Sequence, residues 1–211
     1  MNGRIVVSHH SSLDFLDLSG DLWVYNKSGK PVSGVTDIQI SNDGREGSVY
    51  LRHIIENYDN LADKTIFIQD DLHNHQPSID KFIEHAEKDI DFYQFPCTWR
   101  KDNPTLHKRE IVNGFIDLPT IRNKEAIVDF CWRFNLTLPY RYETETCCFF
   151  MASRDVLLSV TKEKYKLIAS WLRENPDNEF VFEHCYKLLF IKWKRKADLR
   201  SRSQLVLATN W

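Results

Sequence analysis

The 211-residue sequence has no long run of apolar residues. No stretch approaches the roughly 20 apolar residues that a membrane-spanning helix needs, and the segment from Met1 to Ser8 lacks the apolar core of a signal peptide. A large excess of one charge is also missing, because the formal net charge is −2. General nucleic-acid-binding proteins carry a strongly basic surface. We therefore expect a protein with no membrane span and no nucleic-acid partner.

Cysteine is scarce and poorly spaced for disulfides or zinc. The chain has five cysteines, an odd number, and no Cys-x-x-Cys pair that would indicate a zinc or redox site. Cys147 and Cys148 are adjacent, which disfavours a bond between them. We expect all five cysteines to be reduced, as in a cytoplasmic protein.

The composition is that of an ordinary globular domain. Hydrophobic residues make up 42% and charged residues 27% of the chain, and its length suits one domain. No internal repeat or low-complexity segment is present. We assign residues 1–193 to a single domain and residues 194–211 to a basic tail, which is either a solvated terminus or the start of a linker to a further domain.

Short buried runs alternate along the chain with segments of helical periodicity. The runs predict strands at 4–8, 21–25, 35–40, 65–68 and 146–151. Apolar spacing predicts helices at about 42–60, 78–86, 124–134, 161–174 and 179–192. A capping box of Asp43 and Glu46 opens the first helix, and residues 89–121 read as an irregular functional loop. This order predicts an α/β, Rossmann-like fold with a mixed central sheet of about six strands flanked by helices.

Two adjacent aspartates, Asp70 and Asp71, directly follow the predicted strand at 65–68. Ligands of open α/β sheets collect at the carboxyl ends of strands, and adjacent carboxylates repel each other unless a cation lies between them. Carboxylate oxygens suit Mg²⁺ or Mn²⁺ together with substrate phosphates. The pair therefore predicts a divalent metal site, and the alternative is a simple turn after the strand.

The start of the first predicted helix, Asp43–Gly47, carries two glycines and Arg45. A helix N-terminus attracts anions through its free N–H groups, and Arg45 suits a phosphate or carboxylate. The alternative is a well-capped helix in which Arg45 pairs with Glu46.

Three further positions carry charge near strand ends. Glu143 and Glu145 precede the predicted strand at 146–151 and suit a general base, although edge charges that prevent aggregation explain them equally well. Arg154 follows that strand and suits a phosphate or a local salt bridge.

Two histidines near the aspartates in the sequence suggest an alternative function. A metal-dependent hydrolase or phosphoesterase would use His73 and His75 together with Asp70 and Asp71. The alternative for the histidines is a solvated loop. A non-catalytic sugar-nucleotide-binding domain is the third possibility.

The order of these motifs resembles a GT-A-type glycosyltransferase. The resemblance rests on Asp70-Asp71, on Gly44–Gly47 through Arg52, and on Phe150-Met-Ala-Ser-Arg154. A narrower resemblance, to a fungal and viral family of unknown function, rests on Tyr25–Lys27, Gly44–Gly47, Tyr50-Leu51 and His53–Ile55. The chain as a whole also resembles the small glycosyltransferase domain encoded by chlorella viruses. The resemblance spans roughly residues 4 to 190.

The resemblance implies an enzyme that moves a hexose from a UDP-sugar to a hydroxyl of a glycan, such as a viral capsid glycan in the host cytoplasm. It implies Mn²⁺ or Mg²⁺ held by Asp70 and Asp71, with Asp71 counted as catalytic through the metal. Donor contacts are expected from Ser8, His9, Tyr25, Asn26, Lys27, Arg45, Asp70 and Arg154. Trp99 and Arg100 are expected to contact the acceptor. Because the aspartates are adjacent, which of them contacts the metal stays open. No acidic motif after the predicted strand at 146–151 stands out as an inverting base, so the stereochemistry of transfer also stays open.

Overall fold

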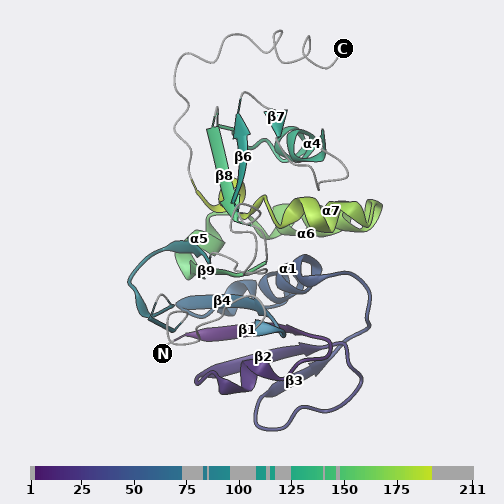
Figure 1. Cartoon of the computed structure of the whole chain (residues 1–211), viewed down its shortest axis with the longest axis vertical. Coiled ribbons are helices and arrows are strands. Elements are labelled where there is room, and N and C mark those ends of the chain that lie inside the picture. The colour runs from purple at the N-terminus through teal and green to yellow at the C-terminus, as the bar shows by residue number, and fades with distance from the viewer. Residues whose placement is uncertain are drawn as a thin grey trace.

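The computed structural model describes residues 3–72, 83–84, 86–95, 108–112, 115–116, 125–139, 141–145 and 148–191 (Figure 1). Several predictions fall outside these residues: His73 and His75, the helix start at Ser78, the acceptor contacts Trp99 and Arg100, and the tail from 194. Within the described residues, no helix is both long and apolar enough to cross a membrane.

A mixed six-stranded sheet forms the centre of the molecule, in the order β3-β2-β1-β4-β9-β5. Its strands are β1 (Arg4–His9), β2 (Asp21–Asn26), β3 (Thr36–Gln39), β4 (Lys64–Gln69), β5 (Phe92–Gln94) and β9 (Phe150–Ser153). The pairs β1–β2, β2–β3 and β1–β4 are parallel, and β9 runs antiparallel to both β4 and β5. The predicted α/β fold with a mixed sheet of about six strands is confirmed.

Helices cover both faces of this sheet. The alternation of side chains along buried strands sends Val6 and Phe67 into one apolar cluster, and Ile5 and Ile68 into another. The first cluster lies under α1 (Glu46–Glu56), and α6 (Lys162–Glu174) and α7 (Asp177–Phe182) form a further layer beyond α1 (Figure 1). The second cluster is closed by Phe15 of the short 3₁₀ helix η1 (Asp14–Asp17).

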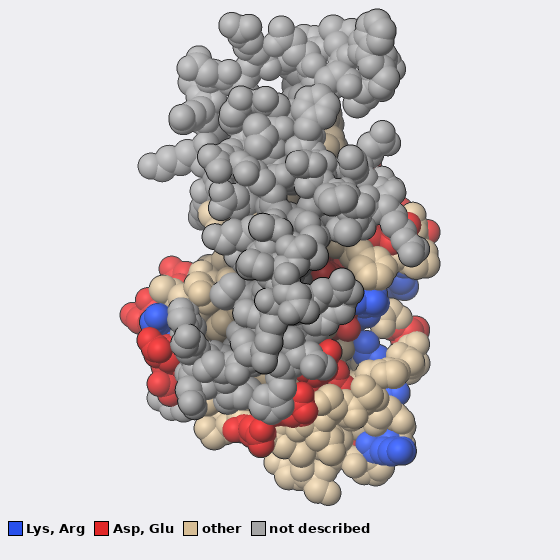
Figure 2. Space-filling view, in the orientation of Figure 1, with Lys and Arg blue, Asp and Glu red and all other residues tan. Residues whose placement is uncertain are grey.

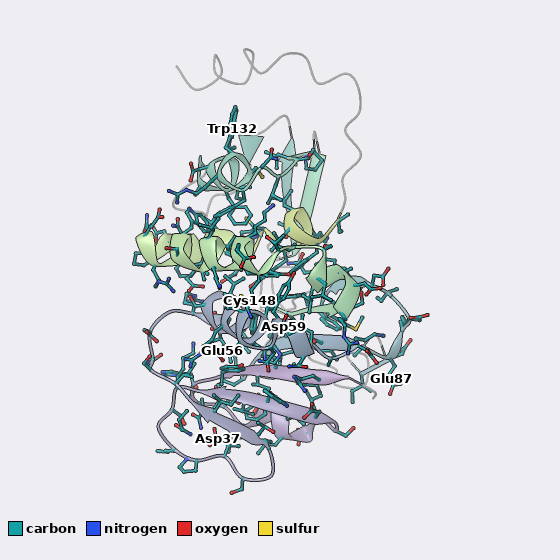
Figure 3. The ribbon with its side chains drawn as sticks, turned by 180° about the vertical axis from the view of Figure 1, so that it is seen from behind. Asp37, Glu56, Asp59, Glu87, Trp132 and Cys148 are labelled. Atoms are coloured by element: carbon teal, nitrogen blue, oxygen red, sulfur yellow. The ribbon has the colours of Figure 1, made fainter. Side chains whose placement is uncertain are left out.

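A smaller antiparallel sheet lies beyond the helical layer, in the order β7-β6-β8. It consists of β6 (Lys108–Val112), β7 (Phe115–Ile116) and β8 (Arg141–Glu145), beside α4 (Glu125–Arg133). Trp132 projects from α4 on the side away from the six-stranded sheet (Figure 3). The prediction that residues 89–121 are irregular was therefore wrong, since β5, β6 and β7 all fall in this range.

The remaining helices confirm some predicted limits and correct others. The helix expected at 161–174 is α6, and the Thr161 hydroxyl accepts a hydrogen bond from the Lys164 N–H at its start. The single helix expected at 179–192 is wrong, because the chain breaks between α7 and α8 (Tyr186–Phe190). The short helices η2 (Tyr58–Asn60) and α5 (Arg154–Leu158) were not expected. The capping box at Asp43 is also wrong: Arg45 is the N-cap residue, and Asp43 accepts from Ser41 instead.

His53 of α1 is fully buried, and its position predicts a dependence of stability on pH. Burial, and secondarily the charge of Arg4, lower the pKa of His53 to about 3. In the unfolded chain His53 binds a proton below about pH 6.5, so between these values the unfolded state binds more protons. The free energy of unfolding should therefore fall with decreasing pH from about 6.5 towards 3, by at most about 1.4 kcal/mol per unit from this group.

Urea unfolding at several pH values, on the wild type and on His53→Gln, measures this effect. The variant should show a flatter profile between pH 6.5 and 4. The exposed His10, replaced in His10→Gln, is the matched control and should keep the wild-type slope. Equal slopes in wild type and His53→Gln would contradict the prediction.

Candidate functional site

The strand order reverses between β1 and β4. From β1 the chain adds β2 and β3 on one side, and α1 then carries it back to β4 on the other side of β1. In open α/β sheets the crevice at such a reversal, outside the carboxyl ends of the strands, is where ligands bind. The residues that follow β1 and β4 at this edge are the loop 10–13 and the pair Asp70-Asp71. The edge is therefore the candidate functional site.

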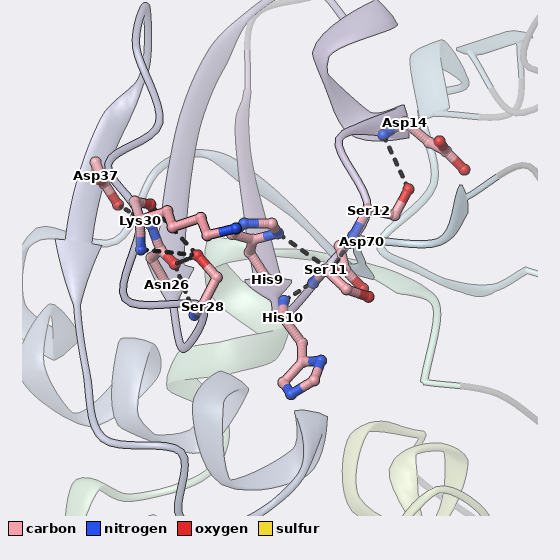
Figure 4. A network of polar contacts seen from close by, with 10 residues as sticks. All are labelled: His9, His10, Ser11, Ser12, Asp14, Asn26, Ser28, Lys30, Asp37 and Asp70. Atoms are coloured by element: carbon pink, nitrogen blue, oxygen red, sulfur yellow. Dashed lines mark hydrogen bonds and ion pairs between the residues drawn. The ribbon is translucent and has the colours of Figure 1, made fainter.

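Asp70 holds the loop after β1 in place. Its Oδ2 atom accepts hydrogen bonds from the backbone N–H groups of His10, Ser11 and Ser12 at 2.6–2.9 Å, and it lies 3.1 Å from Nδ1 of His9 (Figure 4). Asp70 is only 7% exposed. Burial alone would raise the pKa of its carboxyl group, but the three N–H donors outweigh burial and hold that pKa below its usual value. Asp70 is therefore an ionised carboxylate inside a nest of backbone donors.

Asp71, the next residue, is partly exposed at the same edge. The side chain of His10 points away from Asp70 (Figure 4), and both His10 and Ser11 are exposed. Of the two predicted metal ligands, the Asp70 carboxylate thus already accepts hydrogen bonds from the backbone, and Asp71 is the more exposed of the two.

The residues at the end of β2 have side chains that bond mainly to other residues of the protein. Tyr25 is fully buried, its hydroxyl lies 3.1 Å from Nδ1 of His53, and burial raises its pKa to about 12. The amide of Asn26 is also committed: it donates to Lys30 and Asp37 and accepts from Ser28 (Figure 4). The Tyr25 and Asn26 side chains are therefore both engaged within the protein, whereas we had expected them to contact the sugar-nucleotide donor.

Two further predicted donor contacts lie close to the reversal. Ser8 is buried in the sheet between β2 and β4. Lys27 is half-buried, and its ammonium donates to the carbonyl of Gly44 at 3.1 Å. This contact ties the end of β2 to the start of α1, so Arg45 lies at the same edge.

The N-terminus of α1 receives a carboxylate from the chain itself. Glu179 of α7 is buried, and its Oε1 accepts hydrogen bonds from the Arg45 N–H and the Ser48 hydroxyl. Burial raises the pKa of Glu179 in spite of these donors. Gly47 permits the approach, because a Cβ there would lie 2.8 Å from Oε2 of Glu179. The helix start that we predicted as a phosphate site therefore receives a carboxyl group of the chain itself.

A cluster that the sequence did not indicate lies beside this helix start. Oxygens of Glu46 and Glu183 and the sulfur of Cys148 lie within 4.8 Å of one another, and the Arg45 guanidinium lies 3.5 Å from Glu46 and 3.8 Å from Glu183. The hydroxyl of Tyr50, one turn after Glu46, is buried without a hydrogen-bond partner. These residues are far apart in the sequence, and only the spacing of Glu46 and Tyr50 on α1 offers a local signal.

The other predicted residues fall at two different places. Arg154 follows β9, which is antiparallel to β4, and it therefore lies at the opposite edge, where it donates to Leu61 and pairs with Asp63 at 2.9 Å. The structure separates Arg154 from the candidate site. Glu143 and Glu145 belong to β8 of the small sheet, opposite Glu110 and Lys108.

The position of β8 is nevertheless tied to the candidate edge. Thr144 lies between the two glutamates, and its hydroxyl donates to the side-chain carbonyl of Gln94 at 3.2 Å. Gln94 ends β5, whose carboxyl end lies at the same edge as that of β4. Glu143 and Glu145 are thus the sequence neighbours of Thr144, the residue that connects β8 to the candidate edge.

Fold and site together define an α/β protein with a polar cluster at the carboxyl edge of a mixed sheet. The family model described as "Protein of unknown function (DUF3431)" matches residues 21–204, so the chain belongs to this family. No curated protein and no solved structure matches the chain.

Proposed function

We propose that this protein is a metal-dependent glycosyltransferase that moves a hexose from a UDP-sugar to a hydroxyl of a glycan. The observation that carries the proposal is the pair Asp70-Asp71 at the carboxyl end of β4, beside the reversal of strand order. The GT-A resemblance of the motif order supports the choice of a nucleotide sugar. Fold alone does not define an activity, so the proposal depends on these residues.

The donor set fits a hard divalent ion. Carboxylate oxygens are the ligands that Mg²⁺ and Mn²⁺ prefer, and Asp70 is ionised. Because Oδ2 of Asp70 already accepts from the loop backbone, Asp71 would be the main ligand and Asp70 would hold the loop beside it. A bound metal neutralises charge that develops on a departing diphosphate.

The chain's own groups at the edge would bind the rest of the donor. Lys27 and the exposed residues His10 and Ser11 would contact the diphosphate and the uridine, while Tyr25 and Asn26 fix the strand end that carries Lys27. For the acceptor, we keep Glu143 and Glu145 as the proposed base, because Thr144 anchors their strand at the same edge.

Calorimetric titration of UDP, GDP and CMP, with and without Mn²⁺, tests the proposal. UDP alone should bind, and only with the metal. Asp71→Asn should weaken UDP binding by at least roughly tenfold, which corresponds to about 1.4 kcal/mol. Asp89→Asn is the matched control, since Asp89 is an exposed aspartate near the amino end of β5.

Two outcomes would contradict the proposal. If no nucleotide binds while Mn²⁺ still binds and is lost in His73→Ala or His75→Ala, the hydrolase becomes the better hypothesis. If UDP binds equally well to wild type and Asp71→Asn, Asp71 is not the metal ligand.

A further inference from the structure

A cavity of about 690 Å³ lies on the outer side of α1, away from the loop after β1. Its walls are α1, the segment 40–45 that precedes it, and the corner between α6 and α7. Its volume falls in the range of about 300–1,000 Å³ that is typical of small-molecule sites. The cavity reaches Gly44 and Arg45, which Lys27 connects to the end of β2. The cavity therefore adjoins the helix start that Lys27 ties to the candidate edge.

The floor of this cavity is apolar, and an aromatic ring stands at its margin. The apolar lining includes Ile40, Val49, Ile55, Ala169 and Leu172. Phe180 of α7 is 44% exposed, an unusual state for a large aromatic side chain, and the Arg45 guanidinium lies over its ring at 4.3 Å from the centroid. The guanidinium covers one face of the ring, and the rest of the ring lines the cavity beside its apolar floor, where it offers a contact surface for the apolar face of a sugar ring.

The rim carries charged groups of both signs. Arg52 and Glu56, which form an ion pair at 2.8 Å, line one wall, and Asp43 and Arg173 line others. Figure 2 shows Lys and Arg side chains, with some Asp and Glu, gathered on the right-hand side of the molecule, the side on which α1 begins. Within the described part of the chain, no ion pair engages Arg173.

This mixture matches the chemistry of hydroxyl groups. A hydroxyl donates one hydrogen bond and accepts others, so adjacent carboxylates and guanidiniums satisfy it from both sides. A ligand of strong net charge would instead be repelled by half of the rim. We propose that the cavity between α1 and the α6–α7 corner binds a neutral oligosaccharide and holds part of the glycan acceptor. The acceptor role rests on the proposed transferase function.

Titration of the full chain with maltotriose, cellotriose and tri-N-acetylchitotriose, followed by calorimetry, tests this site. At least one trisaccharide should bind to the wild type. Phe180→Ala should weaken that binding roughly tenfold through loss of the stacking surface, and Arg173→Gln should weaken it about fivefold through loss of one hydrogen-bond donor. Leu167→Ala removes an exposed apolar side chain of α6 outside the cavity and should bind like the wild type.

Failure of this proposal is distinct from failure of the proposed function. If none of the three sugars binds, or if binding is the same in Phe180→Ala and Arg173→Gln as in the wild type, the carbohydrate site is wrong. The UDP titration of the wild type reports separately on the donor site. Loss of UDP binding in Phe180→Ala would overturn the acceptor assignment and give the cavity to the nucleotide.

Discussion

Replacing Asp70 by alanine should lower the free energy of unfolding by about 3 kcal/mol. The substitution removes the acceptor of three backbone N–H groups in the loop after β1, and each donor left without a partner costs about 1 kcal/mol or more. The loss is large because all three donors converge on the Oδ2 atom of Asp70. Urea unfolding at pH 7 measures the difference.

The dependence on pH separates this role from a simple loss of packing. The lowered pKa of Asp70 means that its contribution is complete above the unfolded value of about 3.9 and disappears as the pH falls through the folded value. Asp70→Ala should therefore lose stability at pH 7 and differ less from the wild type near pH 2. Asp89→Ala, at an exposed position, should match the wild type at both values. A constant difference between pH 7 and pH 2 would argue against the ionised nest.

Gly47→Ala should destabilise the protein by about 2 kcal/mol, although alanine is the better helix former. In an exposed helix interior, this exchange stabilises by roughly 0.5–1 kcal/mol. At Gly47 the new Cβ would lie 2.8 Å from Oε2 of Glu179 and 2.9 Å from Cδ1 of Phe182. Both atoms belong to α7, so α1 and α7 must separate, and overpacking of this kind costs about 1–3 kcal/mol.

Thermal and urea unfolding of Gly47→Ala give the sign of the effect directly. Glu56→Ala, in the last turn of α1 and outside the contact with α7, is the control for a substitution to alanine in the same helix. It should change stability by less than about 0.5 kcal/mol. A stabilised Gly47→Ala would show that α7 does not press on α1 as described.

Local signals in the sequence predicted much of the sheet and several helices. The uncharged run Thr65–Ile68 became most of β4, and the apolar spacing of 161–174 became α6, because both patterns report burial of a single element. The break between α7 and α8 escaped because the segment 183–185, Glu-His-Cys, contains no glycine or proline that would mark the end of a helix.

The sheet edge at which a residue lies could be predicted only for residues after a strand that runs parallel to β1. Asp70 and Asp71 were placed correctly at a carboxyl end, since their strand belongs to the parallel part of the sheet. Arg154 was not, because nothing local indicates that β9 runs antiparallel and carries Arg154 to the opposite edge. The role of Gly47 was also hidden, since its partner Glu179 lies 132 positions further along the chain.

The two internal carboxyl groups, those of Asp70 and Glu179, connect segments that lie far apart in the sequence. Asp70 contacts the loop after β1 from 58–60 residues away, and Glu179 contacts the start of α1 from 131–134 residues away. These hydrogen bonds of the loop and of the helix start therefore form only when segments distant in the sequence come together. Closing such long loops is slow and costly in chain entropy. The local order of the candidate site thus depends on long-range contacts of the fold.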